Sequence, residues 1–100
     1  MVWLNSFLVR EVRLMNINDI FLAQLPKIDL HGFDRDSARV AVNDFIDEAI
    51  AMGYDEILII HGIGSGIVKN VVRDVLTKRK DILKFHLVPE NIGCTIVVIK

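Results

Sequence analysis

The sequence is poor in cysteine, in net charge and in long apolar runs, and each shortage excludes a class of protein. Its one cysteine, Cys94, cannot form a disulfide within the chain, and its apolar setting predicts a buried thiol in a cytoplasmic protein. No apolar run approaches the roughly 20 residues of a membrane span. The apolar first ten residues lack the basic start and the cleavage site of a secretory signal. We therefore expect no membrane partner.

What the chain does have is apolar residues in regular patterns. Hydrophobic residues make up 52% of its 100 residues, and the mean hydropathy is +0.41. A chain of this kind is not disordered, and its length is that of one domain. We expect an N-terminal apolar extension over residues 1–24 and the domain itself over residues 25–100.

The first strand–helix unit is predicted from Lys27 onward. Residues 27–31 read as a strand in which Ile28 and Leu30 share one face, so Asp29 and His31 share the other. A helix then begins at Asp34, whose carboxylate can cap free amides, and ends at Gly53. Its expected apolar stripe is Ala38, Ala41, Val42, Phe45, Ala49 and Met52.

A second unit follows, and then two strands. Residues 56–60 are apolar on both faces, which favours an interior strand. The next helix begins near Ser65 or Gly66. Its expected stripe is Ile67, Val68, Val71, Val72 and Val75. Strands at 85–88 and 95–99, with a turn at 89–93, complete a β-α-β-α-β-β order. The sequence thus predicts an α/β two-layer sandwich, a four-stranded sheet with two helices.

The N-terminal extension is harder to interpret. Asn16 or Asn18 can cap a short helix that continues to Gln24, whereas residues 7–14 fit a strand and a helix equally well. If both long helices lie on one face of the sheet, the other face needs a cover. The apolar side chains that can supply it, from this chain or from a second copy, are Trp3, Leu4, Phe7 and Leu8.

Each of the first two strands ends at His-Gly, which is the most informative pattern in the chain. If the strands are parallel neighbours, His31 and His61 come to the same sheet edge, where open α/β sheets bind ligands. Asp29 and His31, two residues apart on one strand face, suit a general acid or base. The alternative is an ordinary surface pair.

The loop after the second strand reads Gly62-Ile63-Gly64-Ser65-Gly66 and opens a helix. Its amides and the helix N-terminus can bind a phosphate, with Lys69 leaning back to assist. The spacing matches neither the dinucleotide nor the nucleoside-triphosphate fingerprint, and a tight structural turn remains the alternative. His61 is either a candidate general acid or phosphate ligand, or a buried histidine bonded to the backbone.

Charge is unevenly distributed along the chain. Residues 34–56 carry a net charge of −5, and residues 69–84, which include Lys69 and Arg73, carry +4. A local basic patch can meet phosphates even in a neutral chain, although solvated helix faces are the more ordinary interpretation. His86, in an apolar strand, is interpreted as structural. Zinc is disfavoured because one cysteine and scattered histidines lack ligand spacing.

Three motifs together resemble the Smr (small MutS-related) domain family. They are Asp29-Leu30-His31-Gly32, then His61-Gly62-Ile63-Gly64-Ser65-Gly66, then Gly93-Cys94-Thr95 before an apolar strand. The match runs from about Leu25 to Lys100 in order and spacing. It implies a fold like the C-terminal domain of translation initiation factor 3, nucleic-acid binding and, in many members, endonuclease activity. His31 is present, and members that lack it are suspected of not cutting.

The resemblance has departures. The family often has a basic residue where Ile63 stands and leucine-arginine where Val68-Lys69 stands, and its usual Gly-Gly turn is reduced to Gly93. These changes lower the local positive charge of the loop.

The leading hypothesis is a nucleic-acid endonuclease. Phosphate rests on the loop amides of Gly62, Gly64, Ser65 and Gly66, with Lys69 and Arg73 nearby, while Asp29 orients His31 as general base. With RNA, the 2′-hydroxyl serves as nucleophile and no metal is required; DNA would need an activated water and a divalent ion such as Mg²⁺. A second hypothesis is a non-catalytic module that binds nucleic acid or the ribosome. A third is a subunit that docks, or forms a homodimer, through the N-terminal apolar segment.

Overall fold

The computed structural model describes residues 17–100, and its elements follow the predicted order, with the predicted short helix ahead of the sheet. They are α2 (Ile17–Gln24), β1 (Lys27–Asp29), α3 (Arg35–Ala51), β2 (Glu56–Ile60), α4 (Ile67–Lys78), β3 (Ile82–Val88) and β4 (Asn91–Ile99). The predicted helix ending at Gln24 is therefore present as α2. The predicted roles of Trp3, Leu4, Phe7 and Leu8 fall outside the described residues.

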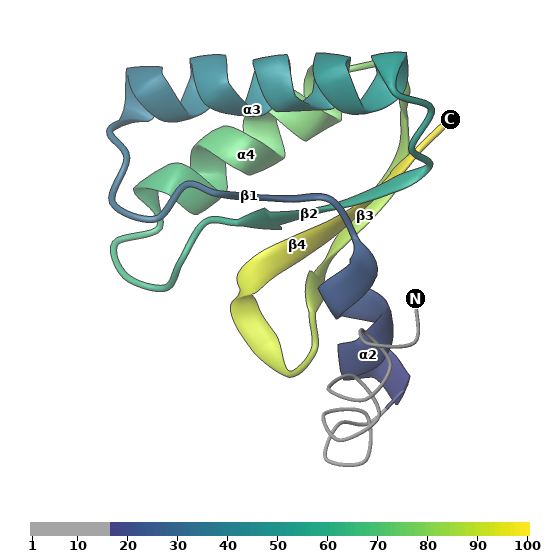
Figure 1. Ribbon diagram of the computed structural model, residues 1–100. Coiled ribbons are helices and arrows are strands. Elements are labelled where there is room, and N and C mark those ends of the chain that lie inside the picture. The colour runs from purple at the N-terminus through teal and green to yellow at the C-terminus, as the bar shows by residue number, and fades with distance from the viewer. Residues whose placement is uncertain (1–16) are drawn as a thin grey trace, which may run out of the picture.

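The four strands form one mixed sheet in the order β1-β2-β4-β3. β1 and β2 are parallel, whereas β4 runs antiparallel to both β2 and β3. α3 and α4 lie side by side on one face, and α2 lies against the other side of the sheet (Figure 1). The α/β sandwich is confirmed, and β2 is the interior strand that its two apolar faces predict.

The core lies between the two long helices and the sheet. The predicted N-cap at Asp34 is present, since its Oδ1 accepts a hydrogen bond from the Ser37 amide at 2.7 Å. Buried core side chains from the helices are Ala38, Val42, Ile46, Ala49, Val68, Val71, Val72, Val75 and Leu76. Burial of these side chains, at about 25 cal/mol for each Å² of apolar surface, is the main stabilising term.

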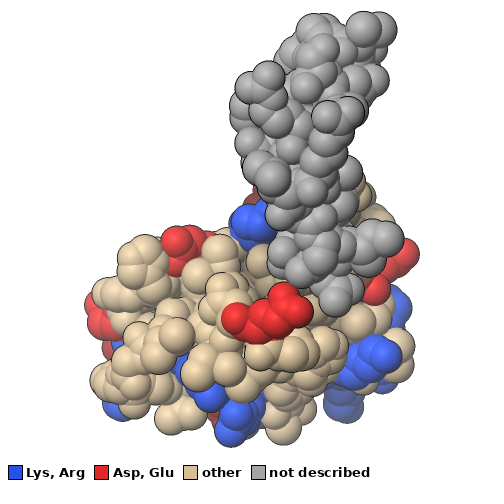
Figure 2. All heavy atoms as spheres, turned by 90° about the horizontal axis from the view of Figure 1, so that it is seen from below, with Lys and Arg blue, Asp and Glu red and all other residues tan. Residues whose placement is uncertain are grey.

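The other sheet face has a smaller apolar cluster. Leu58, Val88 and Cys94 are buried there, and Leu22 of α2 and Leu25 pack against them. Cys94 is the predicted buried thiol, and burial raises its pKa. Seen from below, the described atoms that are not covered show acidic and basic side chains in small separate groups (Figure 2). The described part of the chain contains no helix long and apolar enough to cross a membrane.

Four details differ from the sequence-based expectation. β3 and β4 begin earlier than predicted, and the turn between them shrinks to Pro89-Glu90 because Asn91 already pairs with Val88. Met52 lies beyond the end of α3 at Ala51 and is exposed, whereas Ile46, which the predicted stripe left out, is buried in the core. Ile67, the first residue of α4, is 44% exposed, whereas its neighbour Val68 is buried in the core.

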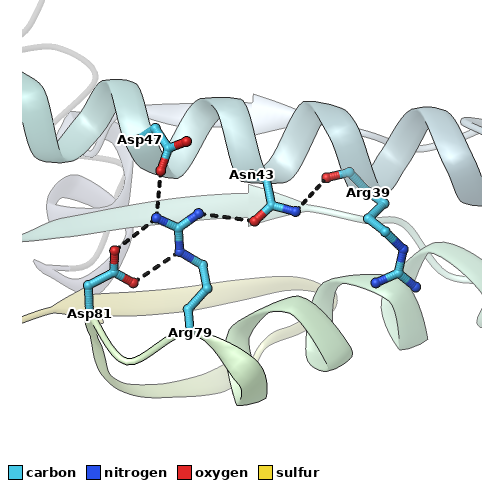
Figure 3. A network of polar contacts seen from close by, with 5 residues as sticks. All are labelled: Arg39, Asn43, Asp47, Arg79 and Asp81. Atoms are coloured by element: carbon cyan, nitrogen blue, oxygen red, sulfur yellow. Dashed lines mark hydrogen bonds and ion pairs between the residues drawn. The ribbon is translucent and has the colours of Figure 1, made fainter.

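The charged segments meet across the contact between α3 and α4. Arg39 of α3 pairs with Asp74 of α4 at 2.8 Å. Arg79, just after α4, bonds Asp81 through two nitrogens and also Asn43 and Asp47 of α3 (Figure 3). Two side chains of each charged segment, Arg39 and Asp47 of the first and Asp74 and Arg79 of the second, therefore pair across the contact between the helices.

Candidate functional site

The two His-Gly strand ends lie at the same edge of the sheet. β1 and β2 pair in parallel, and the Leu30 amide donates to the Ile60 carbonyl at 2.7 Å, which extends the pairing one residue beyond β1. The loop from β1 to α3 and the loop from β2 to α4 therefore come together at one end of the molecule (Figure 1). The predicted convergence of the two motifs is confirmed.

Asp29 and His31 form a hydrogen-bonded pair on the exposed side of β1. Asp29 Oδ1 lies 2.6 Å from His31 Nδ1 and also accepts the His31 amide at 3.1 Å. Because a carboxylate only accepts, Nδ1 donates to Asp29, and Nε2 is the acceptor in the neutral ring. Leu30 between them is fully buried, which fixes which way the two polar side chains face. The imidazole, 72% exposed, is thus oriented and accessible.

The same hydrogen bonds act on the carboxylate. They hold the pKa of Asp29 below its ordinary value of 3.8, and the bond from the His31 ring is the largest cause. Asp29 is therefore ionised at neutral pH and remains an acceptor for the imidazole. The pair has the orientation that a general base needs.

The glycine loop has a backbone that only glycine adopts without strain. Gly62, Gly64 and Gly66 have φ values of +83°, +150° and +84°. Gly66 is the N-cap of α4 and offers no side-chain cap, and the first backbone bond of the helix runs from Asn70 to Gly66. Among the described residues, the amides from Ile63 to Gly66 have no backbone acceptor. They are free donors at the positive end of a helix.

Gly62 connects the three sequence motifs. A Cβ at this position would lie 3.1 Å from the Cβ of His31, so only glycine allows this approach. The amides of His61 and Gly62 both donate to the Gly93 carbonyl at 2.9 Å. The Gly62 amide is therefore occupied, and the free donors of the loop are the amides that follow it.

His61 is buried, and both of its ring nitrogens have partners. Nδ1 lies 3.0 Å from the Gly62 carbonyl, and Nε2 lies 2.9 Å from Thr95 Oγ1. A carbonyl can only accept, so Nδ1 donates and Nε2 accepts from the threonine hydroxyl. Burial lowers the pKa of His61, and the nearby charges of Lys69 and Arg73 lower it further, although the Gly62 carbonyl opposes them. The ring is thus neutral at pH 7.

A cavity of about 430 Å³ lies between the two loops. Its lining includes the predicted site residues His61, Gly62, Gly64, Ser65, Gly66 and Lys69. Asp29 and His31 do not line it; they lie beside it, where His31 contacts Gly62. Arg73 lies one turn further along α4, in a second hollow of about 180 Å³ that shares Lys69 with the first.

Comparison with known proteins places this geometry in a family. Residues 28–100 match the Smr domain family. The chain belongs to that family. An Endonuclease MutS2 from Streptococcus suis is 35% identical over 77 residues, which is 74% of this chain. An Endonuclease MutS2 from Lacticaseibacillus casei is 34% identical over 66 residues, 66% of this chain. The chain spans about a tenth of the length of these curated relatives.

Solved structures agree with the fold. The Smr domain of Thermus thermophilus MutS2 superposes with a TM-score of 0.73 at 26% identity, covering 76% of this chain and 99% of that one. YdaL, a stand-alone small MutS-related protein from Escherichia coli, gives a TM-score of 0.72 at 27% identity over 77% of this chain and 66% of that one. The order and packing of this Smr domain are therefore those of its relatives.

Sequence reasoning missed two groups around the site of this Smr domain. Phe33 lines the cavity. The only signal for it in the sequence is that this aromatic residue lies outside the apolar stripe of α3. His86, interpreted as structural, is exposed and lines the second hollow with Lys69 and Arg73. Within residues 17–100, no group of three or more His, Cys, Asp or Glu side chains is placed to hold a metal ion.

Proposed function

We propose that this Smr domain is a nucleic-acid endonuclease in which His31 is the general base. The observation that carries the proposal is the 2.6 Å hydrogen bond from His31 Nδ1 to Asp29, placed directly beside the glycine loop. The bond leaves Nε2 free to accept a proton, and the loop supplies free amides for a phosphate. The relatives named Endonuclease MutS2 support the choice of reaction.

On RNA, the pair can start cleavage within the substrate. His31 Nε2 takes the proton of a 2′-hydroxyl, and the 2′-oxygen forms a bond to the adjacent phosphorus while the bond to the 5′-oxygen breaks. The departing 5′-oxygen takes a proton from water, and the loop amides stabilise the charge that develops on phosphate oxygens. On DNA the nucleophile is a water, and a divalent ion such as Mg²⁺ would help to activate it.

The buried His61 holds the start of the glycine loop in place through its hydrogen bonds. Its hydrogen bonds to the Gly62 carbonyl and to Thr95 join the end of β2 to β4. Since neither ring nitrogen is free, we assign His61 to positioning the loop and not to proton transfer. Lys69, which lines both hollows, is a cation available to a phosphate on the loop.

A cleavage assay with the whole chain tests the proposal. The substrates are labelled single-stranded RNA, single-stranded DNA and supercoiled DNA, each with Mg²⁺ or with EDTA. We expect cutting by wild type, a loss of at least 10²-fold in His31→Ala, and a smaller loss in Asp29→Asn. The matched control is Asp44→Asn. Asp44 is an exposed carboxylate on α3 that is distant in sequence from Asp29 and His31 and lines neither hollow.

A non-catalytic binding module is the second candidate function. It is favoured by one observation, that the cavity is complete without Asp29 and His31. In that case wild type and His31→Ala would bind nucleic acid equally well and neither would cut. Cutting that persists in His31→Ala would contradict the assignment of the base.

A further inference from the structure

Phe33 is an exposed aromatic side chain that the core does not need. It lies between Gly32 and the N-cap Asp34, and its amide donates to the Leu30 carbonyl at 3.0 Å, which fixes the turn. Its side chain is 42% exposed and belongs to neither apolar cluster. It lines the cavity between the two loops.

Two further apolar side chains of the same cavity are exposed. Ile63 is 76% exposed and Ile67 is 44% exposed, and both lie on the side of the glycine loop. Apolar groups gathered around a hollow that also presents free backbone donors are typical of ligand sites. The volume of about 430 Å³ is that of a site for one small ligand group.

A phosphate alone does not account for this lining. Phosphate on the loop amides would leave Phe33, Ile63 and Ile67 in water, whereas a flat aromatic group over Phe33 would cover them. The cavity also has few cations, since only Arg35 and Lys69 carry positive charge in its lining and Asp34 opposes them. A ligand held here must gain affinity from apolar contact as well as from charge.

We propose that this cavity binds an unpaired base stacked on Phe33, so that the substrate is single-stranded nucleic acid. The inference rests on the proposed function and narrows its substrate class. Inside a duplex both faces of each base are covered by neighbouring base pairs, so away from the duplex ends only an unpaired base can present a face to Phe33. Base–aromatic stacking of this kind accepts any base, because every base has a π-face.

The position of the cavity relative to His31 gives the stacked base a role in cleavage. Phe33 is two residues after His31, and Gly62 lines the cavity on one side and contacts His31 on the other. A strand whose base sits on Phe33 can therefore lay its phosphate over the loop toward His31. Phe33 selects the unpaired nucleotide next to the bond that is cut, and is a positioning residue.

Fluorescence anisotropy with labelled oligonucleotides of one sequence tests this. The ligands are single-stranded RNA, single-stranded DNA and a blunt duplex, and the proteins are wild type, Phe33→Leu and the control Phe21→Leu. Phe21 is 47% exposed on α2 and lines a different hollow. We expect wild type to prefer single strands, Phe33→Leu to lose about tenfold in affinity for them, and Phe21→Leu to match wild type.

A fluorescence signal that reports stacking directly distinguishes a loss of stacking from a loss of folding. Phe33→Trp should bind single strands at least as tightly as wild type, and its fluorescence should be quenched on binding because the base lies on the indole. Phe21→Trp carries the same native Trp3 background and should not be quenched. Urea unfolding of each variant confirms that the fold is retained.

The outcomes separate this inference from the proposed function. If wild type binds and cuts but prefers the duplex, or if Phe33→Leu binds single strands as wild type does, stacking is overturned and the endonuclease stands. If wild type binds no nucleic acid, both are overturned. Quenching in Phe33→Trp together with intact binding in His31→Ala supports stacking even if cleavage is absent.

Discussion

At the scale of residues, the site depends on Gly62, where the three motifs touch. On one side its Cα lies against the Cβ of His31, and on the other it lies against Gly93, where an added Cβ would be 3.3 Å from the Gly62 carbonyl carbon. Neither glycine has room for a Cβ unless neighbouring atoms shift. The glycines of this loop thus matter for close packing as well as for the turn itself.

Gly62→Ala should therefore destabilise the fold by more than the strain of its left-handed backbone alone would. Gly53→Ala is the matched control, since Gly53 has nearly the same φ, +81° against +83°, and nothing within 4 Å of its added Cβ. Each variant should lose about 1–3 kcal/mol through the left-handed backbone, with Gly62→Ala at the higher end. Urea unfolding measures this, and cleavage should fall only in Gly62→Ala. Equal losses of stability and cleavage in the two would refute the role of close packing.

His61 should make the stability of the fold depend on pH. Its pKa in the folded protein lies below the ordinary value of 6.5 because of burial, so the unfolded chain binds the proton more readily. The contribution of His61 to the stability of the fold is therefore fully present above the pKa that it has in the unfolded chain. The stability decreases as the pH falls from that pKa toward the lower pKa of the folded protein. Unfolding measured between about pH 7.5 and about pH 5.5 should show this decrease in wild type. A decrease of the same size in His61→Asn would show that another group is responsible.

At the scale of elements, polar contacts across α3 and α4 set how the two helices meet. Arg79 Nη2 lies 2.6 Å from Asp47 on α3 and 2.8 Å from Asp81 just before β3, and Nη1 reaches Asn43 at 3.0 Å. Its guanidinium is only 18% exposed. These bonds raise the pKa of Arg79 and lower that of Asp81, so both remain charged at neutral pH.

Arg79→Ala should destabilise the domain by about 2 kcal/mol, because it leaves two carboxylates and an amide without their shared donor. Arg79→Lys should recover only part of this loss, since an ammonium cannot make the two parallel bonds to Asp81. Arg39→Ala breaks a pair whose side chains are 43% and 37% exposed, and should cost less than about 1 kcal/mol. Thermal unfolding of the three variants ranks them; equal losses for Arg79→Ala and Arg39→Ala would argue against a network.

At the scale of the whole molecule, the charge left for a ligand is small. The net charge is −1, and of the cations in residues 69–84, Arg79 pairs with Asp47 of α3 and with Asp81, and Lys78 pairs with Asp74. Lys69 and Arg73, in the two adjoining hollows, make no ion pair among the described residues. Binding should therefore depend on amides and apolar contact more than on a broad basic surface.

The salt dependence of binding should reflect this. For single strands, log K falls with log salt by about 0.7 for each phosphate contact, so contacts from Lys69 and Arg73 give a slope of about −1.4. Lys69→Ala and Arg73→Ala should each reduce the slope by about 0.7, and Lys80→Ala should leave it unchanged. Titrations at several salt concentrations measure the slope. A value steeper than about −4 would point to a wide basic surface instead.

Much of the site was predictable because it depends on local patterns. Alternation along residues 27–31 places Asp29 and His31 on one face, and a glycine-rich stretch after an apolar strand predicts a loop that opens a helix. What alternation cannot show is that Gly62 packs on His31, since the two are 31 residues apart in the chain. The exposure of Ile67 was also hidden, because its spacing fits the apolar stripe of α4 equally well.

The order of elements, the faces of the strands and the family can be read from the amino-acid sequence, because periodicity, caps and motifs are all properties of neighbouring residues. Three features follow from the folded arrangement instead: which charges pair, the bonding of both ring nitrogens of His61, and the exposure of Phe33 beside the loop. Those outcomes depend on the parallel pairing of β1 with β2 and on β4 lying next to β2. Such pairing joins residues that are distant in the chain, and no local pattern records it.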